Sequence, residues 1–189
     1  ELPRAGIIHR LDKDTTGLMI VGKHLVAYNQ LVDDMQHRLI KRHYLALAQG
    51  AFISGSSIDE PIGRHPRHRV KMAVTGAGKK AVTHYRIRAR YPSYTLLDIE
   101  LETGRTHQIR VHLSSISHPV MGDPVYGGGL RQCPSSAPES LRLLLHDIDA
   151  QLLHAVLLGF THPITQENLQ FRSNKLNRIN EIIESLDII

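Results

Sequence analysis

The sequence predicts an α+β fold: a mixed, mainly antiparallel sheet with flanking helices. Several segments alternate apolar and polar residues, as strands with one buried face do. Few segments between them have helical spacing, which argues against a doubly wound parallel sheet. The length of 189 residues suits one compact domain with a sizeable core. We therefore expect a single domain over residues 1–189.

The first half of the chain is predicted to contain short strands and one helix. Apolar residues at three- and four-residue spacing predict an amphipathic helix over 24–39. Its C-terminal end carries Arg38, Lys41 and Arg42, where cations suit the helix dipole or could equally face RNA. The other elements expected here are short strands at 7–8 and 18–21, a strand at 44–48, a loop through 57, a basic loop at 61–71 and a hairpin tip at 76–80.

The second half begins with a strand over 82–90 whose residues of one parity are strongly basic. A turn at 103–104 then leads into a short helix that carries Arg105 and His107 near its start. The remaining elements expected here are a strand at 97–101, a loop at 118–129, a polar insertion at 132–139, a buried strand at 152–160 and an amphipathic helix at 176–186.

Composition narrows the class of protein. The formal charge of +5 favours a polyanionic partner, although charge alone is equally compatible with a mildly basic protein that has none. The single cysteine, Cys133, excludes an internal disulfide and agrees with a reducing cytoplasm. No apolar run reaches eighteen residues, so we expect no transmembrane helix, no membrane partner and a cytoplasmic location.

The most informative segment is the charged turn at residues 9–18, which lies next to an apolar run. Charges close to a core must be paired or hydrated, and they often carry chemistry. We predict that Asp12 is the attacking group of an enzyme. A nearby guanidinium would keep the carboxylate ionised, and Arg10 and Arg105 are the candidates. The alternative is a structural ion pair that closes two loops.

A series of motifs follows in order along nearly the whole chain. They are HRLD at 9–12 with TGL at 16–18, RHYLA at 42–46, LETGRTHQIR at 101–110, HP at 118–119 with GDPVYG at 122–127, and LHA at 153–155 with HP at 162–163. Together they resemble the RluA family of pseudouridine synthases. The resemblance implies the catalytic-domain fold of that family and an isomerisation in which uracil leaves C1′ of its ribose, rotates and rejoins through C5. It implies no cofactor and no metal.

The resemblance also implies roles for single residues. Asp12 would be the essential carboxylate, with Arg105 paired to it, although its chemical route stays open. Tyr44 would stack on the target base; without the resemblance it would be predicted as a core tyrosine on a strand. Arg10 would fill the gap left by an everted uridine or grip its flanking phosphates, and Ile109 would also lie at the substrate.

RNA contacts are expected from two basic segments, as phosphate contacts commonly come from Lys and Arg. The residues are Arg64, Arg67, Arg69 and Lys71 in the loop, and Arg86 and Arg88 in the strand. The alternative for the strand is a solvated edge that uses charge against aggregation. Residues 59–66 and 72–74 favour members that modify large-subunit (23S) ribosomal RNA over transfer RNA. We expect a monomer.

Two family features are absent from the sequence: the earlier strand with its Lys-Pro motif and an S4-type RNA-binding domain. We therefore expect an N-terminally truncated catalytic domain. A non-catalytic RNA-binding module is one alternative function. A phosphatase of the D-x-D-x-T type is another, but His9 and Arg10 interrupt the apolar strand that such enzymes place before the first Asp. Residues 76–80 lack the first glycine and the final Ser or Thr of a P-loop.

Overall fold

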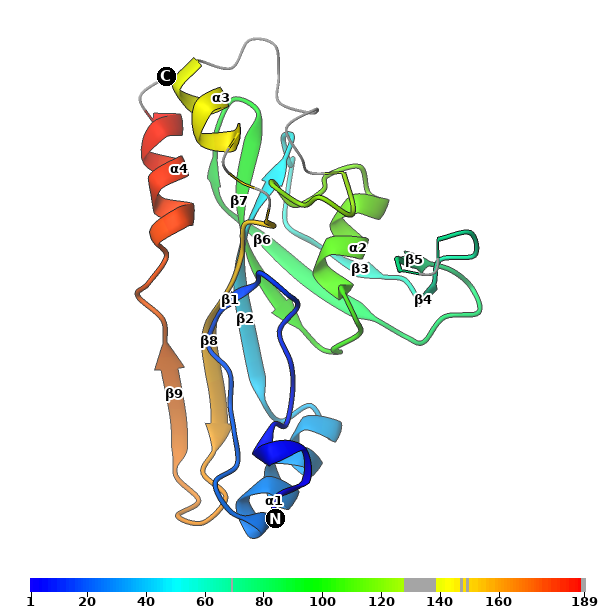
Figure 1. Cartoon of the computed structure of the whole chain (residues 1–189), viewed down its shortest axis with the longest axis vertical. Helices are drawn as coiled ribbons and strands as arrows, with labels where there is room; N and C mark the ends of the chain where they lie inside the picture. The colour runs from blue at the N-terminus through cyan, green and yellow to red at the C-terminus, as the bar shows by residue number, and fades with distance from the viewer. Residues whose placement is uncertain (69, 128–138, 147, 149, 188–189) are drawn as a thin grey trace.

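The computed structural model describes residues 1–68, 70–127, 139–146, 148 and 150–187 (Figure 1). Its helices are α1 (Leu25–Gln36), α2 (Gln108–Ser115), α3 (Glu139–His146) and α4 (Asn177–Asp187). Its strands are β1 (Thr16–Gly17), β2 (Lys41–Gln49), β3 (Ser56–Asp59), β4 (Ile62–Arg64), β5 (Met72–Val74), β6 (Val82–Arg90), β7 (Tyr94–Leu101), β8 (Leu153–Thr161) and β9 (Asn168–Arg172).

Among these described residues, seven strands form one sheet in the order β1-β8-β2-β7-β6-β3, and β9 pairs with the free part of β8. Neighbouring strands are antiparallel except β1, which runs parallel to β8 over two residue pairs. β4 and β5 form a separate hairpin that projects to one side of the sheet (Figure 1). The predicted α+β class with a mainly antiparallel sheet is confirmed.

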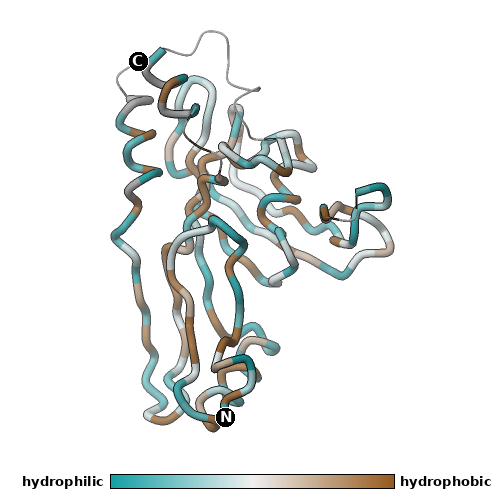
Figure 2. The backbone as a smooth tube through the Cα atoms, in the orientation of Figure 1, coloured by the Kyte–Doolittle hydropathy of each residue, from teal (hydrophilic) through white to brown (hydrophobic). Residues whose placement is uncertain are grey.

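Helices cover both faces of the sheet. On β2, alternation sends Tyr44 to one face and Leu45 to the other. The Tyr44 face packs against α2 through Ile109, whereas the Leu45 face packs against α4 through Ile179. Figure 2 shows apolar residues concentrated along the central strands, while the connection between β4 and β5 is mostly hydrophilic. The pocket described below opens on the Tyr44 face.

α1 closes the end of the molecule that holds the N-terminus (Figure 1). Its buried Leu31 packs with Ile8, Ile20 and Leu158. The helix ends at Gln36, earlier than predicted, because the chain turns there and Arg38 has a φ of 62°. The expectation that Lys41 and Arg42 lie at the end of the helix as cap-like cations was wrong, since both belong to β2.

The charged turn differs from its prediction. In place of a strand at 18–21, the structure has an isolated bridge between Ile7 and Val21, and the pairing moves to β1. Gly17 makes this possible. Its φ is +113°, and a Cβ atom there would lie 2.3 Å from the Ala155 carbonyl oxygen, so only glycine lets the turn approach β8 so closely.

Several short elements were missed. β4 lies inside the predicted basic loop at 61–71, and β3 lies partly in a predicted loop; strands of three to five residues are too short to show clear alternation. β9 and α3 were also not predicted. Arg69, Cys133 and nearly all of the predicted insertion at 132–139 lie outside the described residues. Of the helices in the described part of the chain, none is both long and apolar enough to cross a bilayer.

Candidate active site

A pocket of about 540 Å³ opens beside the charged turn. It collects five residues that the sequence singled out, from three separate parts of the chain: the turn, β2 and the segment that runs from the end of β7 into the first turn of α2. These residues are Arg10, Asp12, Tyr44, Arg105 and Ile109. The sheet thus brings together side chains that lie up to 99 residues apart in the printed sequence.

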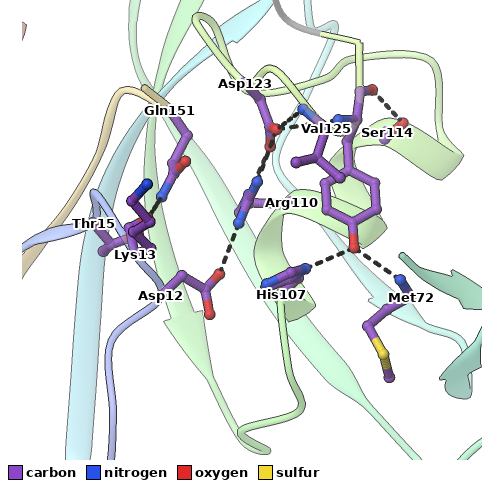
Figure 3. Close-up of polar contacts among 11 residues, drawn as sticks. Asp12, Lys13, Thr15, Met72, His107, Arg110, Ser114, Asp123, Val125 and Gln151 are labelled. Atoms are coloured by element: carbon purple, nitrogen blue, oxygen red, sulfur yellow. Dashed lines mark hydrogen bonds and ion pairs between the residues drawn. The ribbon is translucent and has the colours of Figure 1, made fainter. Parts of the chain in front are cut away.

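The Asp12 turn is held by the segment that leads into β8. Gln151 is buried, and its side-chain Nε2 donates to the Lys13 carbonyl oxygen at 2.6 Å and to Thr15 Oγ1 at 2.9 Å (Figure 3). The Thr15 amide donates to the Asp12 carbonyl oxygen at 3.1 Å and closes the turn. These bonds fix the backbone on which the Asp12 side chain stands.

The guanidinium that meets Asp12 comes from α2. Arg110 Nη1 lies 3.3 Å from Asp12 Oδ2, while its Nε and Nη2 donate to the two carboxylate oxygens of Asp123 at 2.7 and 2.9 Å (Figure 3). The predicted pairing of Arg105 with Asp12 was wrong. Arg105 lines the pocket, but its Nε donates to the Lys80 carbonyl oxygen at 2.9 Å. Arg110 belongs to the same motif and lies on the first turn of α2, which aims it back at the charged turn.

The two carboxylates that share Arg110 differ in their surroundings. The Asp123 side chain is 0% exposed, and its Oδ1 also accepts the backbone amides of Val125 and Tyr126. The Asp12 side chain is 15% exposed and has the single longer contact. Burial alone would lower the pKa of Arg110, but the hydrogen bond and charge of Asp123, together with Asp12, outweigh it and raise that pKa. The guanidinium is therefore a fixed cation, and Asp12 keeps oxygen lone pairs free toward the pocket.

His107 adds a polar wall to the pocket and was not among the predicted site residues. The Tyr126 hydroxyl accepts the Met72 amide at 2.9 Å and forms a hydrogen bond with His107 Nδ1 at 2.7 Å. Burial lowers the pKa of His107, although Asp12 opposes the shift. His107 has a φ of 57°, which marks the turn that starts α2.

Tyr44 forms the apolar side of the pocket. It is buried, with 7% of its surface exposed, and packs in one cluster with Ile109 and Leu153. Burial raises the pKa of its hydroxyl, which therefore stays protonated at neutral pH. The pocket thus combines a flat aromatic side chain with a carboxylate that a fixed cation holds from behind.

Residues 1–115 match the family described as RNA pseudouridylate synthase. This chain belongs to that family. It is 50% identical over 186 residues to "Ribosomal large subunit pseudouridine synthase D" of Pasteurella multocida, which covers 98% of this chain and 57% of that protein. It is also 50% identical over 184 residues to the protein of the same name from Escherichia coli K12, covering 97% of this chain and 56% of the relative.

The chain spans little more than half the length of these relatives. The fold matches a solved structure of "Human RNA Pseudouridylate Synthase Domain Containing 1" with a TM-score of 0.72 and 26% identity, over 89% of this chain and 68% of that one. It also matches "Human RNA Pseudouridylate Synthase Domain Containing 4" with a TM-score of 0.72 over 98% of this chain and 78% of that one. The resemblance to the family that the motifs indicated is confirmed, as is its catalytic-domain fold.

The residues predicted to bind RNA that the structure describes lie outside the pocket. Arg64, Arg67 and Lys71 belong to the β4–β5 hairpin and the loop that joins its strands. Arg86 stands between Tyr85 and Ile87, which pack on the Tyr44 face, so its side chain faces the other side of the sheet. Arg88 pairs with Asp98 on that same far side at 3.2 Å.

The sequence prediction missed His107, which lines the pocket, and three residues that support the pocket from behind: Arg110, Asp123 and Gln151. Each lies inside or beside one of the family motifs, so the signal was the motif itself, but pairing between motifs depends on the fold. Among the described residues, no group of three or more His, Cys, Asp and Glu side chains is arranged to hold a metal ion.

Proposed function

We propose that this chain isomerises uridine to pseudouridine in RNA, with Asp12 as the catalytic carboxylate. The observation that carries the proposal is the Asp12 carboxylate at the pocket, 3.3 Å from a guanidinium that Asp123 fixes in place. The glycosidic bond from C1′ to N1 breaks, a bond from C1′ to C5 forms, C5 loses a proton and N1 gains one. Product and substrate have the same composition, so the reaction needs no co-reactant.

The pocket residues suit the steps of such a reaction. Tyr44 offers a ring on which a uracil can stack, worth about 1–3 kcal/mol, without holding the edge that must turn. Arg10 is exposed beside Asp12 and can take the place of the everted nucleotide or bind its phosphates. Arg105 and Ile109 line the same pocket and would contact the substrate from the α2 side.

We propose large-subunit ribosomal RNA as the substrate, because the relatives at 50% identity are named for it. Transfer RNA is the alternative within the same reaction. Arg64, Arg67, Arg69, Lys71, Arg86 and Arg88 would supply phosphate contacts, with affinity that falls as salt rises. We expect the domain of residues 1–189 to act as a monomer and to require no cofactor and no metal. Action on ribosomal RNA would place the protein in the cytoplasm.

The experiment compares the wild-type chain with Asp12→Asn on large-subunit ribosomal RNA transcribed in vitro, which carries no modifications. Pseudouridines are then mapped at nucleotide resolution, with and without a chelator of divalent cations. We expect discrete sites with the wild-type chain and none with Asp12→Asn, while RNA affinity stays within a few-fold. The same assay is run on unmodified transfer RNA transcripts, and sites found there but not in ribosomal RNA would make transfer RNA the substrate. Equal maps from both proteins would contradict the role of Asp12, and RNA binding without any product would favour a non-catalytic binding module.

A further inference from the structure

Arg42 is a buried cation with no partner for one of its donors. It lies on β2, is 8% exposed, and lines the pocket that holds Asp12 and Tyr44. Its Nε is buried and has no hydrogen-bond acceptor within the part of the chain that the structure describes. Arg110 shows the contrast, since the same kind of side chain there meets two carboxylates.

Such an arrangement is costly unless something else compensates. A buried charge is normally paired or converted to its neutral form, because transfer out of water costs several kcal/mol per ion. Burial does lower the pKa of Arg42, yet a guanidinium remains charged at neutral pH. A buried, charged and incompletely bonded side chain is therefore expected to bind an anion that the free protein does not contain.

The surroundings of Arg42 leave room for that anion. Glu102 lines the same pocket, but its carboxylate is taken by His84 Nε2 at 2.7 Å and by Arg38 Nη1 at 3.4 Å. Gly104 borders the guanidinium, and a Cβ atom at that position would lie 2.7 Å from Arg42 Nη1. Glycine at 104 thus keeps the space around the cation open.

The position relative to Tyr44 identifies the anion. Arg42 and Tyr44 are two residues apart on one strand, about 7 Å along it, and both side chains line the pocket. We propose that Arg42 binds a backbone phosphate adjoining the uridine whose base stacks on Tyr44. The planar guanidinium matches a phosphate through paired donors, which makes it a better partner there than an ammonium group. This inference rests on the proposed RNA substrate and adds an anion subsite to it.

The first test needs no ligand. If Arg42 served the fold, replacing it would destabilise the protein. A ligand-binding role predicts the opposite, because Arg42→Met removes a buried unpaired charge and keeps the length of the side chain. We expect the urea midpoint of Arg42→Met to equal or exceed that of the wild type. A clear loss of stability in this variant, with normal RNA affinity, would overturn the proposal.

The second test removes charge from the RNA. In a hairpin that carries the mapped uridine, the phosphate on its 5′ side or its 3′ side is replaced by a neutral methylphosphonate, and each stereoisomer is assayed separately. For the wild type, one position should weaken binding about 10- to 100-fold, as expected for a hydrogen bond to a charged group. Arg42→Met should bind the unmodified hairpin about 10- to 100-fold more weakly than the wild type does, and the methylphosphonate should weaken its binding little further. Equal losses in both proteins, or none in the wild type, would overturn the proposal.

Two controls keep the result specific. Arg172→Met removes an exposed arginine of β9 that lies outside the pocket and was not assigned to RNA, and it should keep the full methylphosphonate effect. Arg42→Lys keeps the charge and should recover part of the lost affinity. If no uridine is converted, the proposed function fails, and titrations with uridine and its 3′- and 5′-monophosphates decide the inference separately. A monophosphate, but not uridine, should then shift the NMR signal of the Arg42 Nε–H group; no shift would overturn the proposal.

Discussion

Arg110 donates to Asp12 across 3.3 Å although 98 residues separate them in the chain. The contact forms only when the first turn of α2 and the charged turn are both in place, because the two segments are far apart in the sequence. The same guanidinium is clamped more tightly by Asp123, so it is already oriented when it reaches Asp12. The ion pair is therefore a product of the fold that also prepares the pocket.

The two arginines of the LETGRTHQIR segment should respond very differently to substitution. Arg110→Met leaves the buried carboxylate of Asp123 without its cation, which should cost about 3–5 kcal/mol of unfolding free energy. Arg105→Met loses one bond to the Lys80 carbonyl oxygen and should cost less than about 1 kcal/mol. Urea unfolding monitored by circular dichroism measures both. Equal costs for the two variants would contradict the role of Arg110 as the anchor of both carboxylates.

The two carboxylates that share Arg110 should also differ in how much they contribute to stability. Asp123→Asn weakens a fully buried carboxylate with four accepted bonds, and we expect a loss of about 3 kcal/mol or more. Asp12→Asn changes one 3.3 Å contact at the edge of the pocket, so stability should change by about 1 kcal/mol or less. Thermal unfolding of both variants, with pseudouridine formation measured alongside, checks this. A large destabilisation by Asp12→Asn would show that Asp12 mainly serves the fold.

Gln151 is expected to act as a positioning residue. Gln151→Ala removes both bonds that hold the Asp12 turn, and a displacement of about 1 Å at a reacting group can reduce the rate on the order of 100-fold. The turnover rate should therefore fall while RNA affinity changes little. Gln151→Glu is the sharper variant, because a carboxylate cannot donate to the Lys13 carbonyl oxygen and should destabilise the turn further. Normal turnover in both variants would contradict this role.

The sequence predicted the elements and the site residues correctly where the signal is local or is carried by a complete motif. Alternation predicted β6 with its bounds, and helical spacing predicted α1 and α4 nearly in full. The motifs singled out Asp12, Tyr44 and Arg105, and all three side chains line the same pocket. Periodicity succeeds for these elements because they are long and have one buried face.

Contacts between distant segments could not be predicted in the same way. The choice of Arg110 over Arg105 depends on where α2 begins and on the left-handed backbone at His107, which no periodic pattern reveals. The clamp by Asp123 depends on how the loop after α2 returns to the helix. Arg42 was expected near a helix end because positive charge there is common, but the early end of α1 moved it into β2 and toward the pocket.

His9 should make stability fall in mild acid. Burial, followed by the charge of Arg42, lowers the pKa of His9 from 6.5 to about 4, and its Nε2 accepts the Ile20 amide at 3.1 Å only while unprotonated. Because the unfolded chain takes up this proton first, the contribution of His9 is complete above pH 6.5 and is lost as pH falls toward 4, by at most about 1.4 kcal/mol per pH unit.

His9→Gln keeps an acceptor that does not titrate, so its unfolding free energy should fall less steeply over this range. A residual slope remains, because burial also lowers the pKa values of His107, His112 and His154. Urea unfolding at pH 7, 6, 5 and 4.5 measures the difference, and parallel curves for the two proteins would show that His9 is not the titrating group.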